Sequence, residues 1–234
     1  MTNRISWGVT EIGPGHLKNN LPNQDAWLIH NCPEFDLAVV SDGVGSAQKS
    51  EIGSKTICSA VIEATILLSG YPEGRFEDYF ELIHTLWNLS IAPNSPRDCS
   101  ATCLLAVKIF NIVLIARLGD GLIAACGKDG NVTILADSKE DSFSNVTECM
   151  GAVYNPEKWN FKIINPGEYN AVVLCTDGIA DDIPQEKYSD FALHISSHYE
   201  ESEATAREIE IKNWLREWPC PGHSDDKTIV CLYL

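Results

Sequence analysis

The sequence of 234 residues lacks the marks of several protein classes. Basic residues are scarce: 17 lysines and arginines stand against 33 aspartates and glutamates, which gives a formal net charge of −16. Phosphate backbones and anionic lipid head groups repel such a chain, so we expect neither nucleic acid nor a membrane as a partner. Strictly apolar runs stay far below the roughly 18 residues of a membrane-spanning helix, and no basic-then-apolar signal opens the chain.

Cysteine pairs with the spacing of a metal or redox motif are also missing. The nine cysteines are scattered, none forms a Cys-x-x-Cys pair, and five lie in apolar stretches: Cys58, Cys103, Cys126, Cys175 and Cys231. We therefore predict small buried side chains rather than disulfides or a zinc site, and a reducing cytoplasm as the location.

The sequence does contain many short runs rich in valine, isoleucine and leucine. Seven of them are predicted to be strands, at residues 36–41, 102–109, 112–118, 122–126, 131–135, 171–176 and 228–233. Four amphipathic patterns predict helices, at about residues 50–68, 76–87, 188–199 and 211–218.

The order of these elements is a strand, two helices, a run of strands, two helices and a final strand. Strands joined by hairpins and helices in pairs favour an α+β layered domain over a doubly wound βαβ fold. We see no linker and no internal repeat, so we predict a single domain over residues 1–234. Residues 137–166 are the least regular stretch and are predicted to run over the surface.

Acidic residues recur where a strand ends or where a tight turn contains glycine. A single Asp-Gly pair is usually an ordinary turn, but several carboxylates gathered at one rim of a sheet repel each other unless cations neutralise them. Ligation by oxygen alone selects Mg²⁺ or Mn²⁺. The residues in question are Asp25, Asp42, Asp120, Asp177 and Asp225.

Seven motifs in order resemble those of a known family, the metal-dependent type 2C (PPM) serine/threonine protein phosphatases, and in particular their compact bacterial branch. The resemblance covers the chain from about Gly8 to Leu234 and implies a four-layer sandwich, in which two central, mostly antiparallel β-sheets are flanked by pairs of helices. The motifs are Asn23-Gln-Asp25, Ser41-Asp-Gly-Val-Gly-Ser46, Cys99-Ser-Ala-Thr102, Gly119-Asp-Gly121, Thr147-Glu-Cys-Met-Gly151, Cys175-Thr-Asp-Gly-Ile-Ala-Asp181 and Asp225-Asp-Lys-Thr-Ile229.

The resemblance implies two Mg²⁺ or Mn²⁺ ions that bridge a water molecule, which attacks phosphoserine or phosphothreonine on a protein. No side chain then serves as the nucleophile. Asp42 would bridge the ions, with the Gly43 carbonyl on one of them, and Asp177 and Asp225 would complete the second ion. A phosphorylated protein is the implied substrate and a serine/threonine kinase the implied counterpart.

Three further carboxylates receive roles from the same resemblance. Asp25 would orient water around the first ion, and Asp120 and Asp181 would form a weaker third site with Asp177. Independently of the resemblance, Asp177 and Asp181 lie four residues apart and would share a face of a helical turn.

The sequence departs from the family at two positions. Asn20 stands where many members have a phosphate-binding arginine, and His16 or Lys18 just upstream would have to hold the phosphate instead. Val44 stands where eukaryotic members have a histidine proposed to protonate the leaving group; His223 is a candidate, although a structural role fits it better. Two alternatives therefore stay open: a catalytically weak pseudophosphatase that acts as a binding module, and a phosphomonoesterase for small molecules.

Overall fold

The computed structural model describes residues 4–70, 76–136 and 148–234, and within them ten strands form two antiparallel sheets of five. The first sheet has the order β1 (Trp7–Glu11), β10 (Lys227–Tyr233), β9 (Tyr169–Cys175), β6 (Leu122–Gly127) and β7 (Val132–Ala136). The second has the order β2 (Ala26–Asn31), β3 (Phe35–Ser41), β4 (Cys103–Ile109), β5 (Ile112–Leu118) and β8 (Asn160–Ile164).

The two sheets pack against each other, and helices cover their outer faces. On β3, Val40 faces the other sheet whereas Val39 faces the helices, and both side chains are fully buried. On β9, Leu174 and Val173 divide between the two faces in the same way. Because both faces of the central strands are buried, their sequences are continuous apolar runs and do not alternate with polar residues.

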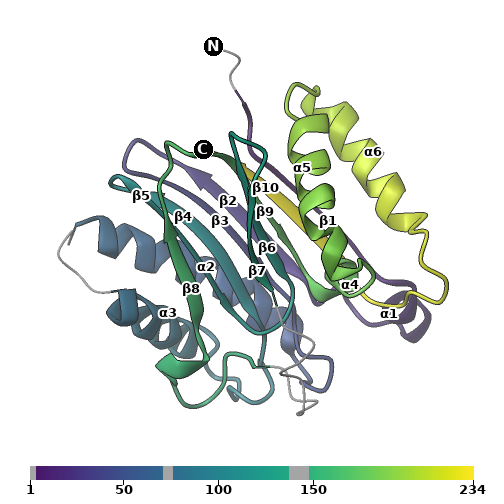
Figure 1. Ribbon diagram of the computed structural model, residues 1–234. Helices are drawn as coiled ribbons and strands as arrows, with labels where there is room; N and C mark the ends of the chain where they lie inside the picture. The colour runs from purple at the N-terminus through teal and green to yellow at the C-terminus, as the bar shows by residue number, and fades with distance from the viewer. Residues whose placement is uncertain (1–3, 71–75, 137–147) are drawn as a thin grey trace.

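The helices form two pairs, one on each side of the packed sheets (Figure 1). The second sheet is covered by α2 (Ser50–Ser69) and α3 (Phe76–Ser90), and the first by α5 (Tyr188–His198) and α6 (Ala204–Arg216). The result is a four-layer α+β sandwich, and the predicted fold class is confirmed. The short elements are α1 (Pro14–Asn19), α4 (Asp177–Ala180), and two 3₁₀ turns, η1 (Pro156–Lys158) and η2 (Gln185–Lys187).

One helix, Ser50–Ser69, is long and apolar enough to cross a membrane by length and composition alone. Half of this stretch is buried inside the protein. Its residues Ile57, Val61 and Ala64 pack in the core beneath the second sheet. Its composition is therefore that of a core helix.

Several elements differ from the sequence-based expectations. Strands β1, β2 and β8 and the short helix α1 were not predicted, and α6 begins at Ala204, seven residues before the predicted start. The prediction of an irregular stretch over residues 137–166 was partly wrong, because β8 lies within it and pairs with β5. Residues 137–147 lie outside the described part of the chain.

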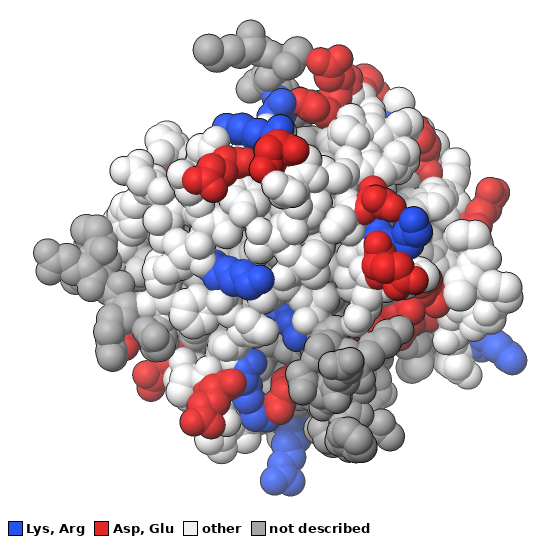
Figure 2. Space-filling model, viewed as in Figure 1, with Lys and Arg blue, Asp and Glu red and all other residues white. Residues whose placement is uncertain are grey.

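The charged side chains do not separate into patches on the face that Figure 2 shows. Lysines and arginines lie among the aspartates and glutamates there.

Candidate metal and phosphate site

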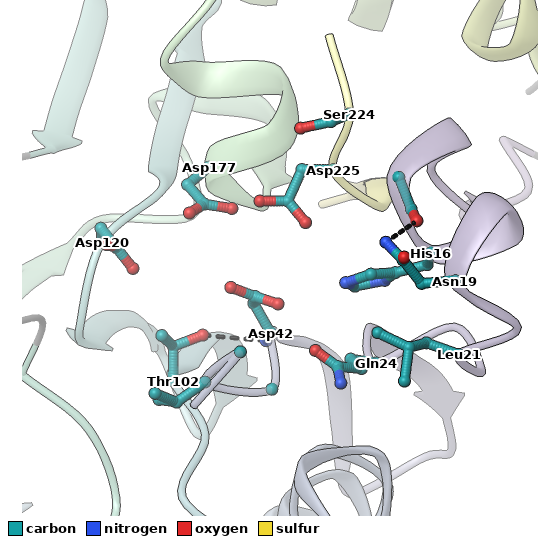
Figure 3. Close-up of a pocket in the computed structure, with 14 residues that line it drawn as sticks. His16, Asn19, Leu21, Gln24, Asp42, Thr102, Asp120, Asp177, Ser224 and Asp225 are labelled. Atoms are coloured by element: carbon teal, nitrogen blue, oxygen red, sulfur yellow. Dashed lines mark hydrogen bonds between the residues drawn. The ribbon is translucent and has the colours of Figure 1, made fainter. Parts of the chain in front are cut away.

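A cavity of about 510 Å³ lies between α1, the end of β3 and the start of α4. No lysine or arginine is among the described residues that line it. The lining consists of Gly15, His16, Asn19, Leu21, Gln24, Asp42, Gly43, Val44, Gly45, Thr102, Asp120, Asp177, Ser224 and Asp225 (Figure 3).

Asp42 follows β3 directly and is held by its backbone. Its N–H donates to Thr102 Oγ1 over 2.9 Å, and its carbonyl accepts from the Thr102 N–H over 2.7 Å. Gly43 lies so close to α2 that an added Cβ would come within 2.7 Å of Ser50 Cβ, which accounts for glycine at this position. The Asp42 backbone is thereby fixed, and its carboxyl group lines the cavity.

Asp25 interacts with Asp42 and is only 4% exposed. Its Oδ2 accepts hydrogen bonds from Thr176 Oγ1 (2.9 Å) and Thr228 Oγ1 (2.7 Å), whereas its buried Oδ1 receives none from a permanent donor. The Asp42 carboxyl group can donate to Asp25 only when it carries a proton. Burial raises the pKa of Asp25 to about 6.

The carboxylates of the cavity raise each other's pKa. Desolvation is the largest cause for Asp42, whose pKa lies well above its usual range, and the charges of Asp25, Asp177 and Asp225 add to it. Desolvation, followed by the charges of Asp120 and Asp225, raises the pKa of Asp177 to about 8. Protons or cations are needed to offset this repulsion.

The donor set fits divalent cations that prefer oxygen. Asp42, Asp177 and Asp225 and the Gly43 backbone converge on one cavity, and the unpaired Asp25 Oδ1 lies behind them. Within the described residues, no three His, Cys, Asp or Glu side chains are close enough to enclose an ion alone. Water would have to complete the coordination, as Mg²⁺ commonly requires.

The residues assigned to the weaker third site are divided between two cavities. Asp120 lies in a tight turn in which Gly119 and Gly121 have φ values of +102° and +106°, and it lines the main cavity with Asp177. Asp181 closes the helical turn of α4, since its N–H donates to the Asp177 carbonyl, but it lines a neighbouring cavity of about 240 Å³. The third site stays a prediction.

The neighbouring cavity contains its own cation. The Lys227 ammonium donates to His223 Nδ1 and to the Asp225 carbonyl, both over 3.1 Å, and lies over the Trp218 ring. Asp182 accepts from Trp218 Nε1 over 2.7 Å. Since His223 lines this cavity and not the main one, its assignment as the leaving-group acid gains no support from the geometry.

The two candidate phosphate ligands on α1 differ in position. His16 lines the cavity, and its ring extends toward Asp42 and Asp225 (Figure 3). Lys18 is exposed and is absent from the cavity lining. Asn20 is also exposed and ends α1 with a φ of +52°, a left-handed conformation that asparagine tolerates better than arginine.

Asp226 is the residue that the sequence reasoning left without a role. It is 1% exposed, and its carboxylate accepts from the Gly13 N–H (2.7 Å), the Gln24 N–H (2.6 Å) and His16 Nδ1 (2.8 Å). Thr102, Gln24 and Ser224 also line the cavity without having been assigned. The adjacent pair Asp225-Asp226 was the only signal for Asp226, and it does not tell which side chain faces inward.

Two packed antiparallel sheets between pairs of helices, with a carboxylate-lined cavity, are the arrangement that the resemblance to the type 2C phosphatases implies. The family model for protein phosphatase 2C matches residues 12–218, and the chain belongs to this family. A sequence comparison with curated proteins finds no match. The predicted family is thereby confirmed.

Solved structures share the fold at low sequence identity. A bacterial serine phosphatase is 16% identical with a TM-score of 0.66, and the match covers 99% of this chain and 98% of that one. The phosphatase Stp1 from Staphylococcus aureus is 16% identical with a TM-score of 0.66, over 100% and 96% of the two chains. RsbX in complex with magnesium is 14% identical with a TM-score of 0.61, over 98% and 94%.

Proposed function

We propose that this protein removes phosphate from phosphoserine and phosphothreonine of protein substrates with the help of two Mg²⁺ or Mn²⁺ ions. The observation that carries the proposal is the convergence of Asp42, Asp177 and Asp225 on a cavity without a lysine or arginine in its described lining. The family and the magnesium complex of RsbX support the metal dependence.

Asp42 would bridge the ions, and Asp177, Asp225 and the Gly43 carbonyl would complete their protein ligands. Bound divalent ions activate water at neutral pH and neutralise the phosphoryl oxygens. The chain itself holds the ligands in place: Thr102 fixes Asp42, and the Asp226 N–H donates to Asp225 Oδ1 over 2.9 Å. A dianionic phosphate would enter beside His16, which we prefer to Lys18 as its contact because Lys18 does not line the cavity.

The family supports the proposed substrate class, and no specific contact in the cavity selects it. The exposed side chain of Leu21 forms part of the cavity lining, where a substrate would approach. We place the protein in the cytoplasm, where it would act opposite a serine/threonine kinase. A binding module without turnover is the main competing function, because Asn20 replaces the family's phosphate-binding arginine.

The test is hydrolysis of phosphoserine, phosphothreonine and phosphotyrosine peptides of one sequence, beside an aryl phosphate and small phosphomonoesters. We expect turnover of the first two peptides with Mn²⁺, its loss with a chelator, and its return with excess Mn²⁺. Equal rates on all small phosphomonoesters with none on peptides would support the small-molecule alternative. Absence of turnover on every substrate would support the binding module.

A further inference from the structure

The buried carboxylate of Asp226 follows a proposed metal ligand in the chain but is not part of the described lining of the main cavity. Its Oδ1 accepts from the Gly13 N–H and its Oδ2 from both the Gln24 N–H and His16 Nδ1. These donors come from the residue before α1, from α1 itself and from the segment leading into β2. One carboxylate therefore connects the start of β10 to three positions, of which His16 and Gln24 line the main cavity.

The hydrogen bond from His16 determines the orientation of its ring. A carboxylate has only acceptor atoms, and Asp226 already receives two backbone N–H groups, so His16 Nδ1 must be the donor. The other ring nitrogen, Nε2, is then left for the cavity into which the ring extends (Figure 3). The side chain of His16 is 17% exposed, so the ring is neither fully buried nor free in solvent.

The backbone of α1 packs against the two residues that precede Asp226 in the chain. The Gly15 N–H donates to the Ser224 carbonyl over 2.8 Å, and an added Cβ on Gly15 would lie 2.8 Å from that same oxygen. An added Cβ on Gly13 would lie even closer to the Asp225 backbone. Glycine at both positions lets α1 come near enough for His16 to reach Asp226.

We infer that Asp226 is a positioning residue that fixes His16 so that its Nε2 contacts the substrate phosphoryl group in place of the missing arginine. This inference rests on the proposed function, and it adds to that function a specific pair of residues. A histidine held by a buried carboxylate is a directed hydrogen-bonding group, whereas a free surface lysine such as Lys18 would have to be ordered by the substrate.

The first test determines which nitrogen of the His16 ring carries the proton, and it does not depend on catalytic turnover. ¹⁵N spectra of the imidazole, recorded at pH 8 on the metal-free and the Mg²⁺-loaded protein, report which nitrogen carries the proton. We expect Nδ1 to carry it in both forms, and we expect the His16 signals to shift on addition of inorganic phosphate to the Mg²⁺ form. A proton on Nε2, or signals unaffected by phosphate, would overturn the inference even if the enzyme hydrolyses phosphopeptides.

The second test separates positioning from a merely structural role. In Asp226→Asn, an amide oxygen facing Gln24 and His16 satisfies two donors, whereas the reverse orientation satisfies only Gly13. We therefore expect Asp226→Asn to keep the Nδ1–H tautomer and most of the affinity for phosphate, and Asp226→Ala to lose both. If Asp226→Asn impairs phosphate binding as much as Asp226→Ala while His16 keeps its tautomer, Asp226 only holds the backbone of α1 in place, and the inference is wrong.

The third test uses variants on α1 and leaves the backbone contacts of Asp226 intact. We expect His16→Ala to lower kcat/KM about ten- to a hundredfold and to weaken inhibition by inorganic phosphate by a similar factor, as loss of a hydrogen bond to a charged group does. Lys18→Ala is the matched control and should remain within about twofold of the wild type. Wild-type phosphate inhibition in His16→Ala would contradict the inference, while absence of turnover in the wild type itself would instead contradict the proposed function.

Discussion

The main cavity and its neighbour are both acidic and share Asp177 and Asp225, but they differ in whether a basic side chain lies beside the carboxylates. In the neighbouring cavity the buried Lys227 supplies a cation beside Asp182 and His223. The described lining of the main cavity has no such residue, and the pKa of Asp42 and of Asp177 is raised there. One cavity thus contains a lysine beside its carboxylates, whereas the described lining of the other contains neither lysine nor arginine, and an external cation would compensate its charge.

Removal of carboxylates one at a time gives the largest expected contrast between the two cavities. Asp42→Asn, Asp177→Asn and Asp225→Asn should each lower kcat/KM by more than about a hundredfold, because each removes a proposed metal ligand rather than core packing. Asp181→Asn is the matched control in the neighbouring cavity and should cost less than about tenfold. If Asp181→Asn lowered kcat/KM as much as Asp42→Asn, the two cavities would not differ in their importance for catalysis, and the third metal site would be favoured.

The stability of the metal-free protein should depend on pH in a direction set by the raised pKa values. Asp177 titrates near pH 8 in the folded state and near 3.8 when unfolded, so between these values the folded protein binds more protons. The free energy of unfolding should therefore fall as the pH rises from about 4 to about 8, with Asp25 contributing up to about pH 6.

Thermal unfolding in a chelator at several pH values tests this linkage. We expect Tm to drop by several degrees between pH 5 and pH 8, and Mg²⁺ or Mn²⁺ to restore it most at pH 8, where protons no longer compete for the carboxylates. At pH 8 without metal, Asp177→Asn should unfold at a higher temperature than the wild type. The increase in Tm should be about 2–4 °C for each kcal/mol of electrostatic repulsion that the substitution relieves. A metal-free Tm that rises with pH across this window would contradict the account.

The smallest effect concerns the cation of the neighbouring cavity. Lys227→Met keeps the volume of a side chain that is 2% exposed but leaves His223 Nδ1 and the Asp225 carbonyl without their donor. We expect a loss of about 1 kcal/mol, or about 2–4 °C in Tm, because the desolvation of lysine offsets part of the gain from these contacts. An increase in Tm would mean that the lysine is a net cost and that this cavity is not self-compensated.

The central strands and the carboxylates at their ends could be predicted because burial on both faces leaves continuous apolar runs. The edge strand β8 could not, since only Ile164 of its five residues is buried and it lies in an irregular part of the sequence. Asp42 was singled out from its place directly after β3, and Asp177 from its place two residues after the end of β9. The Asp226–His16 contact was not, because it joins residues 210 positions apart and depends on how closely α1 approaches the start of β10.

The central claim is that the main cavity holds divalent cations through Asp42, and calorimetric titration of the metal-free protein with Mn²⁺ tests it without any substrate. The account predicts two bound ions per chain in the wild type, loss of this binding in Asp42→Asn, and retention of both ions in Asp181→Asn. Mn²⁺ binding that is undetectable in the wild type, or that Asp42→Asn leaves unchanged, would contradict it.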